Sequence, residues 1–302
     1  EIGNLRLALG WSDRSEPKTN LRLSNALSDF WYFQGLVQEG DGWFKRGLAS
    51  YSVRNELRAE ALGHGAKISY WRDEFDDYSA RCHEAFDIYR ELGDRSGICG
   101  TLPRLGEAAE WQGDFKLAHE YYDAGLAMAK EIQDASSIAN VMRHVGRLAM
   151  KEGDHKSAAK YLRKGLAYYE RVGEQRPTNW TLSYLGLNAI ESGDLLLARS
   201  YLEGALTIAR GLDFPLGLAT PLMYCAALAA AQSDPVRALH LAAASESLAE
   251  SAGAAPIRLT KPIVERWLEQ SRRAVGPKRS AACAAEGRAM TRERAIELAL
   301  TG

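Results

Sequence analysis

The sequence predicts an all-α superhelix built from helix pairs, because one segment recurs along the chain at a constant spacing. Copies begin at residues 112, 152 and 192, so the period is 40 residues, and further copies begin at residues 72 and 232. A first unit from residue 39 is offset by 33 residues instead. Within these copies, apolar residues recur at the three- and four-residue intervals of an amphipathic helix. Repeats of this length are typical of stacked helix pairs, in which each pair buries its apolar face against its neighbours.

In the copies that begin at residues 112, 152 and 192, a Gly-Asp pair separates the preceding helix from the helix that follows. Asp154 and Asp194 take the position expected of an N-cap, where the carboxylate accepts hydrogen bonds from free backbone N–H groups at the positive end of the helix. The preceding Gly153 and Gly193 suit the left-handed residue that ends the first helix. Equivalent turns are expected at Asp114 and Asp234. The pattern therefore predicts a first helix, a tight turn and a second helix in each repeat.

Two columns of small residues indicate that the helices of a pair approach closely. Gly146 and Gly186 share a column of the first helices, and Ala158 and Ala198 share a column of the second helices. The same columns hold Gly106, Ala226, Ala118 and Ala238 in other copies. A larger side chain would overpack such a contact. We therefore expect each glycine to lie against the alanine of its partner helix.

Composition argues against several classes of protein. Apolar residues make up 46% of the 302 residues, enough for a continuous core, and 38 basic residues nearly balance 39 acidic ones. That balance argues against a dedicated nucleic-acid surface. The four dispersed cysteines are typical of reduced, packed thiols. No apolar run approaches the ~18 residues of a membrane span, and no signal peptide is recognisable, so we expect a cytoplasmic protein without membrane contact.

The small-residue columns resemble the tetratricopeptide (TPR) pattern, lengthened from about 34 residues to 40. The chain departs from that pattern in lacking the terminal Pro and the usual Trp of the first helix. The Trp position is taken by Leu102, Met142, Leu182 and Leu222. The resemblance implies a TPR-like α–α superhelix whose concave surface is lined by the first helix of every pair.

A second resemblance covers nearly the whole chain. The opening NLRLALGW, the WFKRGLA unit, the recurring Gly-Asp turns and the tail AEGRAMTRERAIELAL are similar to the C-terminal helical-repeat region of bacterial LuxR-type or AfsR-like ATP-dependent transcriptional regulators. The resemblance implies N-terminal helices over 1–38 that join an upstream ATPase domain, TPR-like repeats over 39–252 and capping helices over 253–302. Because the chain opens on Glu rather than Met, we take it for part of a longer protein.

Motifs of catalysis are not recognisable in the sequence. No Walker A loop, GxSxG, HExxH or GxGxxG string occurs, and no two of the six histidines are four residues apart. Carboxylate pairs such as Asp76 and Asp77 fit helix starts, where capping explains them. We therefore expect no enzyme activity, no cofactor and no metal site.

The middle repeats predict a ligand site on the first helices. Arg143 and Arg147 lie one turn apart on one helical face, flanked by Asn140. Neighbouring first helices contribute Trp111 and Trp180. Arginines bind carboxylates or phosphates bidentately, and tryptophans supply apolar contact area. We expect these side chains to be exposed in the groove, as are three further candidates, Glu107, Lys67 and Trp71.

Several of these residues also have a purely structural interpretation. The tryptophans could pack between repeats, and the arginines could pair with Glu107 and Glu110. A basic run over 272–279 could contact an acidic partner or form a solvated link between terminal helices. The last repeat presents Thr220, Met223 and Ala227 to the groove. This repeat carries few polar side chains and is expected to pack against the C-terminal helices as a cap.

The function predicted from these patterns is binding. The leading interpretation is the sensor or partner-binding arm of a bacterial transcriptional regulator, which takes a protein, peptide or small effector in its concave groove. Its further partners would be the upstream ATPase domain and a second copy of the chain, with no direct contact to nucleic acid. The alternative is a free-standing TPR scaffold or peptide receptor of the quorum-sensing kind. Such grooves bind chemically unrelated ligands, so the repeats leave the effector open.

Overall fold

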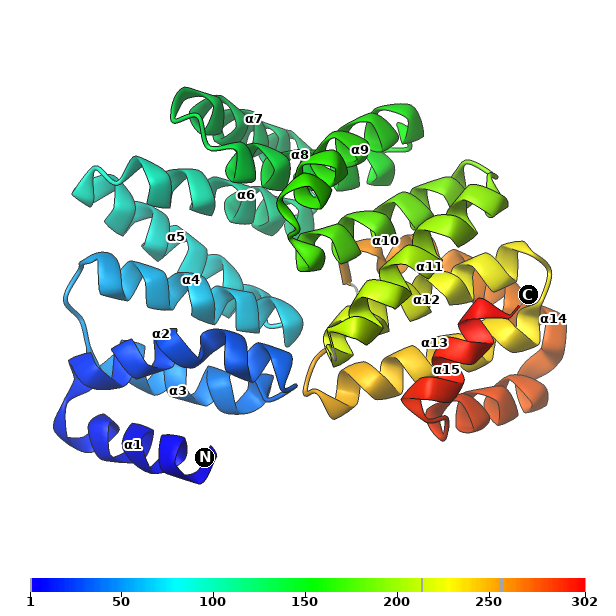
Figure 1. Ribbon diagram of the computed structural model, residues 1–302, viewed down its shortest axis with the longest axis horizontal. Helices are drawn as coiled ribbons and strands as arrows, with labels where there is room; N and C mark the ends of the chain where they lie inside the picture. The colour runs from blue at the N-terminus through cyan, green and yellow to red at the C-terminus, as the bar shows by residue number, and fades with distance from the viewer. Residues whose placement is uncertain (1, 213, 256–257, 302) are drawn as a thin grey trace. The chain divides into compact units, whose positions relative to one another are not determined.

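The computed structural model describes residues 2–212, 214–255 and 258–301, and this part of the chain contains fifteen α-helices, one short 3-10 helix and no strand (Figure 1). The predicted all-α fold is therefore confirmed. The chain divides into two compact units, Glu1–Ser137 and Ile138–Gly302. The division falls inside the repeat region, and each unit is described by itself below.

The first unit holds seven helices that pack on their neighbours along the chain. They are α1 (Ile2–Ser15), α2 (Pro17–Phe33), α3 (Val37–Ser50), α4 (Glu56–Trp71), α5 (Phe75–Leu92), α6 (Arg95–Gln112) and α7 (Phe115–Glu131). The second unit holds most of α8 (Ala135–Lys151), followed by α9 (His155–Val172), α10 (Gln175–Glu191), α11 (Leu195–Gly211), α12 (Pro215–Ala231), α13 (Pro235–Ser251), the 3-10 helix η1 (Arg258–Thr260), α14 (Lys261–Arg288) and α15 (Arg292–Leu300).

The Gly-Asp turns have the predicted structure. Gly153 and Gly193 adopt left-handed backbone conformations with φ of 83° and 80°, which end α8 and α10. The Asp154 carboxylate accepts a hydrogen bond of 3.0 Å from the backbone N–H of Ser157, and Asp194 caps α11 in the same way. Asp114 and Asp234 are the caps of α7 and α13. Each cap satisfies one N–H group that the first turn of a helix otherwise leaves without a partner.

Close approach of the two helices in a pair is also confirmed. A Cβ atom placed on Gly146 would lie 2.7 Å from Cγ of Leu162 and 3.2 Å from the carbonyl oxygen of Ala158. On Gly186 it would lie 2.6 Å from Cγ of Leu202. The glycine therefore faces the turn of the second helix that carries the small residue, as expected, but its tightest neighbour is the leucine one turn further on.

The first unit contains a Gly-Asp pair that is not a turn. Alignment of the unit from residue 39 with the repeats predicts a turn there, but Gly40 and Asp41 lie inside α3. Asp41 is only 4% exposed and caps no helix. Gly40 is required for a different reason, because its Cβ would lie 3.0 Å from Trp31 and 2.9 Å from Ile68. The two residue types that form turns in the later repeats here serve helix packing.

The C-terminal helices pack against the last repeat. Helix α14 packs on both α12 and α13, and Val264 and Leu268 join the same apolar core as Leu222. Arg237 on α13 donates hydrogen bonds of 3.0 and 2.9 Å to the last carbonyl groups of α15. Because α12 is covered on several sides, it can be apolar around nearly its whole circumference.

The basic run over 272–279 lies within α14 and forms ion pairs inside the helix. Arg272 pairs with Glu265, and Arg273 pairs with Glu269 at 2.9 Å. Gly276, with φ of 78°, bends the helix in the middle of this run. These pairs favour the solvated link between terminal helices over a contact with an acidic partner.

The four cysteines are buried and free, as the sequence suggested. None of the described helices combines the length and apolar character needed to cross a membrane.

Candidate ligand site on the first helices

The polar face of α8 carries the predicted arginine site in the second unit. The Arg143 guanidinium is half-buried, and its Nη2 donates a hydrogen bond of 2.8 Å to Oδ1 of Asn140. The same nitrogen lies 3.0 Å from Nε2 of His144. Arg143 is also near Tyr169 of α9, where its charge opposes the rise in the tyrosine pKa that burial causes. Asn140 and Arg143 are thus brought together as predicted, with an aromatic hydroxyl beside them.

Arg147 differs from the expected exposed groove residue, because it is only 1% exposed. Its guanidinium carbon lies 5.9 Å from the centroid of the Tyr184 ring on α10. Tyr184 in turn lies 6.4 Å from the ring of Tyr224 on α12, whose hydroxyl is 2.7 Å from Oγ1 of Thr260. Arg147 therefore begins a buried polar and aromatic row that links three successive first helices.

The side chains expected to face the groove from the first helix of the last repeat, α12, are also buried. Thr220, Met223 and Ala227 are each at most 3% exposed, so the expectation that they face a groove was wrong. The cause is the C-terminal cap, since α14 packs on α12. At the end of α10, Glu191 accepts a hydrogen bond of 2.7 Å from the indole of Trp267 and pairs with Arg266.

Trp180 packs between repeats. It is partly buried against the large apolar core of the second unit, and its ring meets Phe214 edge-on at 6.1 Å. Packing between repeats therefore explains why most of the Trp180 side chain is buried. Part of its surface is accessible.

In the first unit, Trp111 and Glu107 are engaged with α5. The Trp111 ring lies 5.3 Å from Phe75 and 5.5 Å from Tyr78. Glu107 is 8% exposed and accepts a hydrogen bond of 2.7 Å from the hydroxyl of Tyr78, so it is not the exposed residue that we expected. These contacts explain the two residues through packing on the neighbouring helix.

Lys67 and Trp71 lie one turn apart on α4. The Lys67 ammonium lies 4.1 Å above the ring of Tyr32 and 3.0 Å from the carboxylate of Asp29. The Trp71 ring lies 5.8 Å from Tyr32, so the lysine and the tryptophan share one aromatic partner on α2. Both side chains are half-buried, which leaves part of this face accessible.

A histidine that the sequence did not single out lies on the same helix. His64 stacks at 6.3 Å on Phe44, and burial together with the nearby positive charge of Arg104 lowers its pKa from 6.5 to about 4. The unfolded chain therefore binds the proton more readily, and stability that is present above pH 6.5 is lost as the pH falls through about 4.

We predict that His64→Gln removes much of this acid sensitivity. A difference of this size between two pKa values corresponds to at most about 3 kcal/mol of stability between neutral pH and the folded-state pKa. Urea unfolding followed by circular dichroism at several pH values measures it. The control is His83→Gln, at an exposed position of α5. An equally steep loss of stability in wild type and His64→Gln would contradict the assignment.

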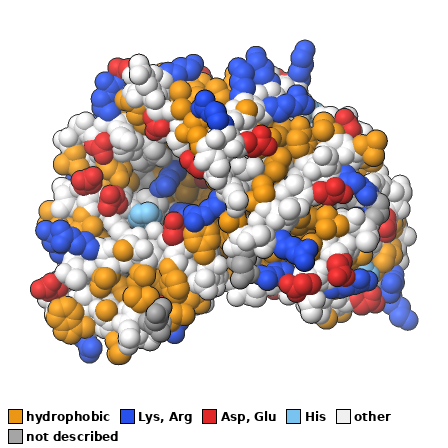
Figure 2. All heavy atoms as spheres, viewed as in Figure 1, with side chains coloured by type: hydrophobic (Ala, Val, Ile, Leu, Met, Phe, Trp, Pro, Cys, Tyr) orange, Lys and Arg blue, Asp and Glu red, His pale blue; other side chains and the backbone are white. Residues whose placement is uncertain are grey.

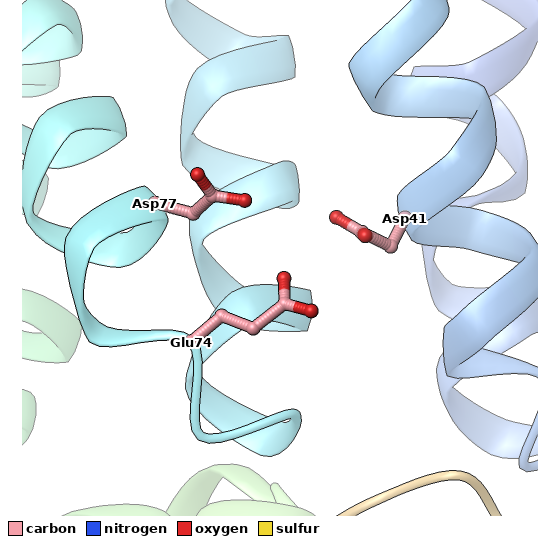
Figure 3. A group of neighbouring side chains, drawn as sticks. All are labelled: Asp41, Glu74 and Asp77. Carbon is pink, nitrogen blue, oxygen red and sulfur yellow. The ribbon is translucent and has the colours of Figure 1, made fainter.

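A second feature missed by sequence reasoning is an acidic cluster in the first unit. Figure 3 shows Asp41 of α3 facing Glu74 and Asp77 at the start of α5. The ammonium of Lys45 lies between them, 2.9 to 3.1 Å from all three carboxylates. Arg81 adds a contact of 3.1 Å to Asp41. The three carboxylates are grouped as they would be around a metal ion, but the cation between them is the ammonium group of Lys45 from the same chain.

Comparison with known proteins supports the fold. No family model matches the sequence, and no curated protein sequence matches it. The structure of a Rap protein complexed with competence and sporulation factor is similar, with a TM-score of 0.71 and 14% identity over 93% of this chain and 77% of that one. The fold is TPR-like.

Two further solved structures are similar to this TPR-like chain. The Rap conjugation gene regulator of plasmid pLS20, in complex with the Phr* peptide, has a TM-score of 0.61 and 16% identity over 90% of this chain and 77% of that one. A Signal Transduction ATPase with Numerous Domains from Pyrococcus horikoshii, with a tetratricopeptide repeat sensor, has a TM-score of 0.52 and 14% identity over 87% of this chain and 40% of that one. At such identities the likeness concerns the fold.

Proposed function

We propose that this chain is the sensor or partner-binding arm of a bacterial transcriptional regulator of the LuxR-type or AfsR-like ATP-dependent class. Its ligand would be a protein, peptide or small effector that docks on the first helices. The order of sequence motifs supports this function, as does the likeness to a signal-transduction ATPase in which TPR repeats form the sensor. The upstream ATPase domain would then be the partner that receives the signal.

The observation that carries the proposal is the state of Arg143. Its guanidinium is half-buried and oriented by Asn140, yet no carboxylate pairs with it among the described residues. Most other arginines of the described chain have an acidic partner, and a partly desolvated charge without one is costly. An anionic group of a ligand would complete this site through a charge-assisted hydrogen bond.

The remaining candidates take supporting roles in this proposal. Arg147 and Trp180 would support the helices that carry the site, because both are engaged in packing between first helices. In the first unit, taken by itself, Lys67 and Trp71 would offer a ligand a cation and an apolar surface on α4, while Glu107 and Trp111 of α6 pack on α5.

The test is Arg143→Gln in the intact regulator. This change keeps a hydrogen-bonding side chain beside Asn140 but removes the charge, so the loss should be about 1.5–3 kcal/mol of ligand binding, or roughly tenfold or more in affinity. Signal-dependent expression of a reporter gene measures the response, and the melting temperature of the purified chain checks folding. We avoid Arg147→Ala, because Arg147 is buried and its removal would disturb the core.

The control for this test is Arg171→Gln, which removes a charge from an exposed position of α9. A normal response from Arg143→Gln would place the ligand elsewhere. A loss of response accompanied by a large drop in melting temperature would show that Arg143 serves stability.

A free-standing peptide receptor is the second candidate function. It is favoured by the likeness to two Rap proteins that were solved with peptides, which extends over at least 90% of this chain. The two functions differ in what precedes the repeats. A Walker A motif encoded directly upstream of Glu1 would support the regulator, and a complete reading frame without one would support the receptor.

A further inference from the structure

A cleft lies where the second helices α9 and α11 meet the end of the first helix α10, and no residue of the arginine site lines it. It has a volume of about 440 Å³ and lies between the start of α9, the end of α10 and the start of α11. Its lining includes His155, Lys156, Arg163, Asn188 and Tyr201. Arg163 donates a hydrogen bond of 3.4 Å to the hydroxyl of Tyr201 across the cleft. Asp194 also lines the cleft, but its carboxylate is engaged as the N-cap of α11.

The wall formed by α9 is strongly basic. This helix carries five basic residues and one acid, whereas the whole chain has a net charge of −1. Figure 2 shows Lys and Arg side chains gathered over α9. None of these five cations forms an ion pair within the described part of the chain, and Lys156, Lys160, Arg163 and Lys164 are among them. Two exposed cations of other second helices do lie near acids, Lys116 at 4.0 Å from Glu120 and Arg90 at 3.0 Å from Asp87.

The cleft also departs from the repeat pattern at a buried position. Asn188 is 4% exposed, whereas the corresponding residues one repeat earlier and one repeat later are Leu148 and Leu228. The side-chain amide of Asn188 donates a hydrogen bond of 3.0 Å to the backbone carbonyl oxygen of His155. Its Oδ1 lies 3.1 Å from Nδ1 of the His155 ring. A leucine fills the equivalent position in the neighbouring repeats, so packing alone does not require an asparagine here. The two polar contacts of Asn188 instead hold the His155 imidazole at the cleft.

Arg163 departs from the pattern in charge. The corresponding residues in the neighbouring copies are acids, Asp123 and Glu203. The cleft therefore combines a charge reversal, a buried amide and a row of unpaired cations.

We propose that this cleft and the basic face of α9 bind an acidic peptide segment of a partner protein. The cleft takes one carboxylate between Lys156 and Arg163, beside the imidazole of His155. The surface continues beyond the cleft, which favours an extended polyanion over a single small anion. This site is separate from the arginine site of the proposed function and does not depend on it.

The spacing of the lysines matches an extended acidic chain. Lys156, Lys160 and Lys164 follow one another at intervals of four residues, which is a rise of about 6 Å along the helix axis for each step. Alternate side chains of an extended peptide are about 6.5 Å apart and point in the same direction. Acids at every second position of the ligand would therefore meet successive lysines.

The experiment uses the purified chain and a fluorescein-labelled peptide with glutamate at every second position. Fluorescence anisotropy gives the affinity, with a peptide of the same length carrying glutamine as the reference. We expect Lys156→Gln with Arg163→Gln to weaken binding on the order of tenfold or more, and added salt to weaken it further. The matched control is Lys116→Gln, at the equivalent position one repeat earlier, which should bind the peptide as wild type does.

A third variant tests the buried amide as a positioning residue. Asn188→Leu restores the residue of the neighbouring repeats, so the melting temperature should stay the same or rise while the affinity for the peptide falls several-fold. Asn188→Gln should recover part of the affinity, because glutamine keeps an amide that can contact His155. Such a recovery would show that the residue orients His155 and does not only fill space.

Several outcomes would overturn this inference. They are equal binding of the glutamate and glutamine peptides, undiminished binding by the double variant, and tighter binding of a single-stranded oligonucleotide that the same substitutions abolish. Arg143→Gln should leave binding of this peptide unchanged. The experiments can therefore contradict the proposal for the arginine site without contradicting the proposal for the α9 surface, and the reverse.

Discussion

Asp41→Asn should destabilise the chain by about 3 kcal/mol, although it alters only one oxygen atom. Asp41 and Arg81 have side chains that are 6% and 8% exposed, and their contact is 3.1 Å. Without the Asp41 charge, the guanidinium stays buried with Asp77 as its nearest remaining acid, at 3.9 Å. Removing one partner of a buried ion pair typically costs about 3–5 kcal/mol, because the other charge is left uncompensated.

The same substitution at Asp77 provides the matched control. Asp77 also contacts Lys45 at 2.9 Å, but its side chain is 42% exposed, so Asp77→Asn should cost at most about 1 kcal/mol. Urea unfolding at neutral pH measures both. Equal losses for the two variants would mean that burial does not decide the strength of this network.

Gly106→Ala and Gly100→Ala should change stability in opposite directions, although both add one methyl group to α6. At Gly106 the new Cβ would lie 2.4 Å from Cε1 of Tyr122, a ring that is fully buried. Overpacking of this kind costs about 1–3 kcal/mol and sometimes more. Gly100 is exposed, and a Cβ atom placed on it would have no neighbouring atom within 4 Å. There alanine should stabilise the helix by about 0.5–1 kcal/mol.

Thermal unfolding of the two variants against wild type checks this pair. A raised melting temperature for Gly106→Ala would show that Tyr122 can move aside, and the column of small residues would then not be a packing requirement. Neither residue lies on the proposed binding surfaces, so affinity for the acidic peptide should be unaffected.

Local chemistry made the repeats predictable. Asp154 and Asp194 cap helices, and Gly153 and Gly193 take positive φ, as the sequence indicated. These properties depend on neighbours within a few residues, which a repeat pattern shows directly. The pairing of α8 with α9 could be predicted from Gly146 for the same reason, since the turn brings the two helices together.

The Gly-Asp pair at residues 40 and 41 shows the limit of that reasoning. It has the same two residues as the turns, but it lies within a helix and Asp41 faces Arg81, forty residues later in the chain. The i, i+4 pairs of Asp41 with Lys45 and of Asp77 with Arg81 were visible in the sequence. Their convergence was not, because it depends on how α3 and α5 are packed.

The sequence by itself determined the helix pairs, their turns and the face of each helix that carries polar side chains. Only the tertiary structure decided which of those faces are open. Arg147 and Met223 have the groove spacing, yet both are buried, and α14 covers the helix of Met223 from a distant part of the chain. The spacing of residues along the sequence indicates the direction in which a side chain points from its own helix. Exposure depends on everything that packs against that helix, which includes segments that no local pattern can reveal.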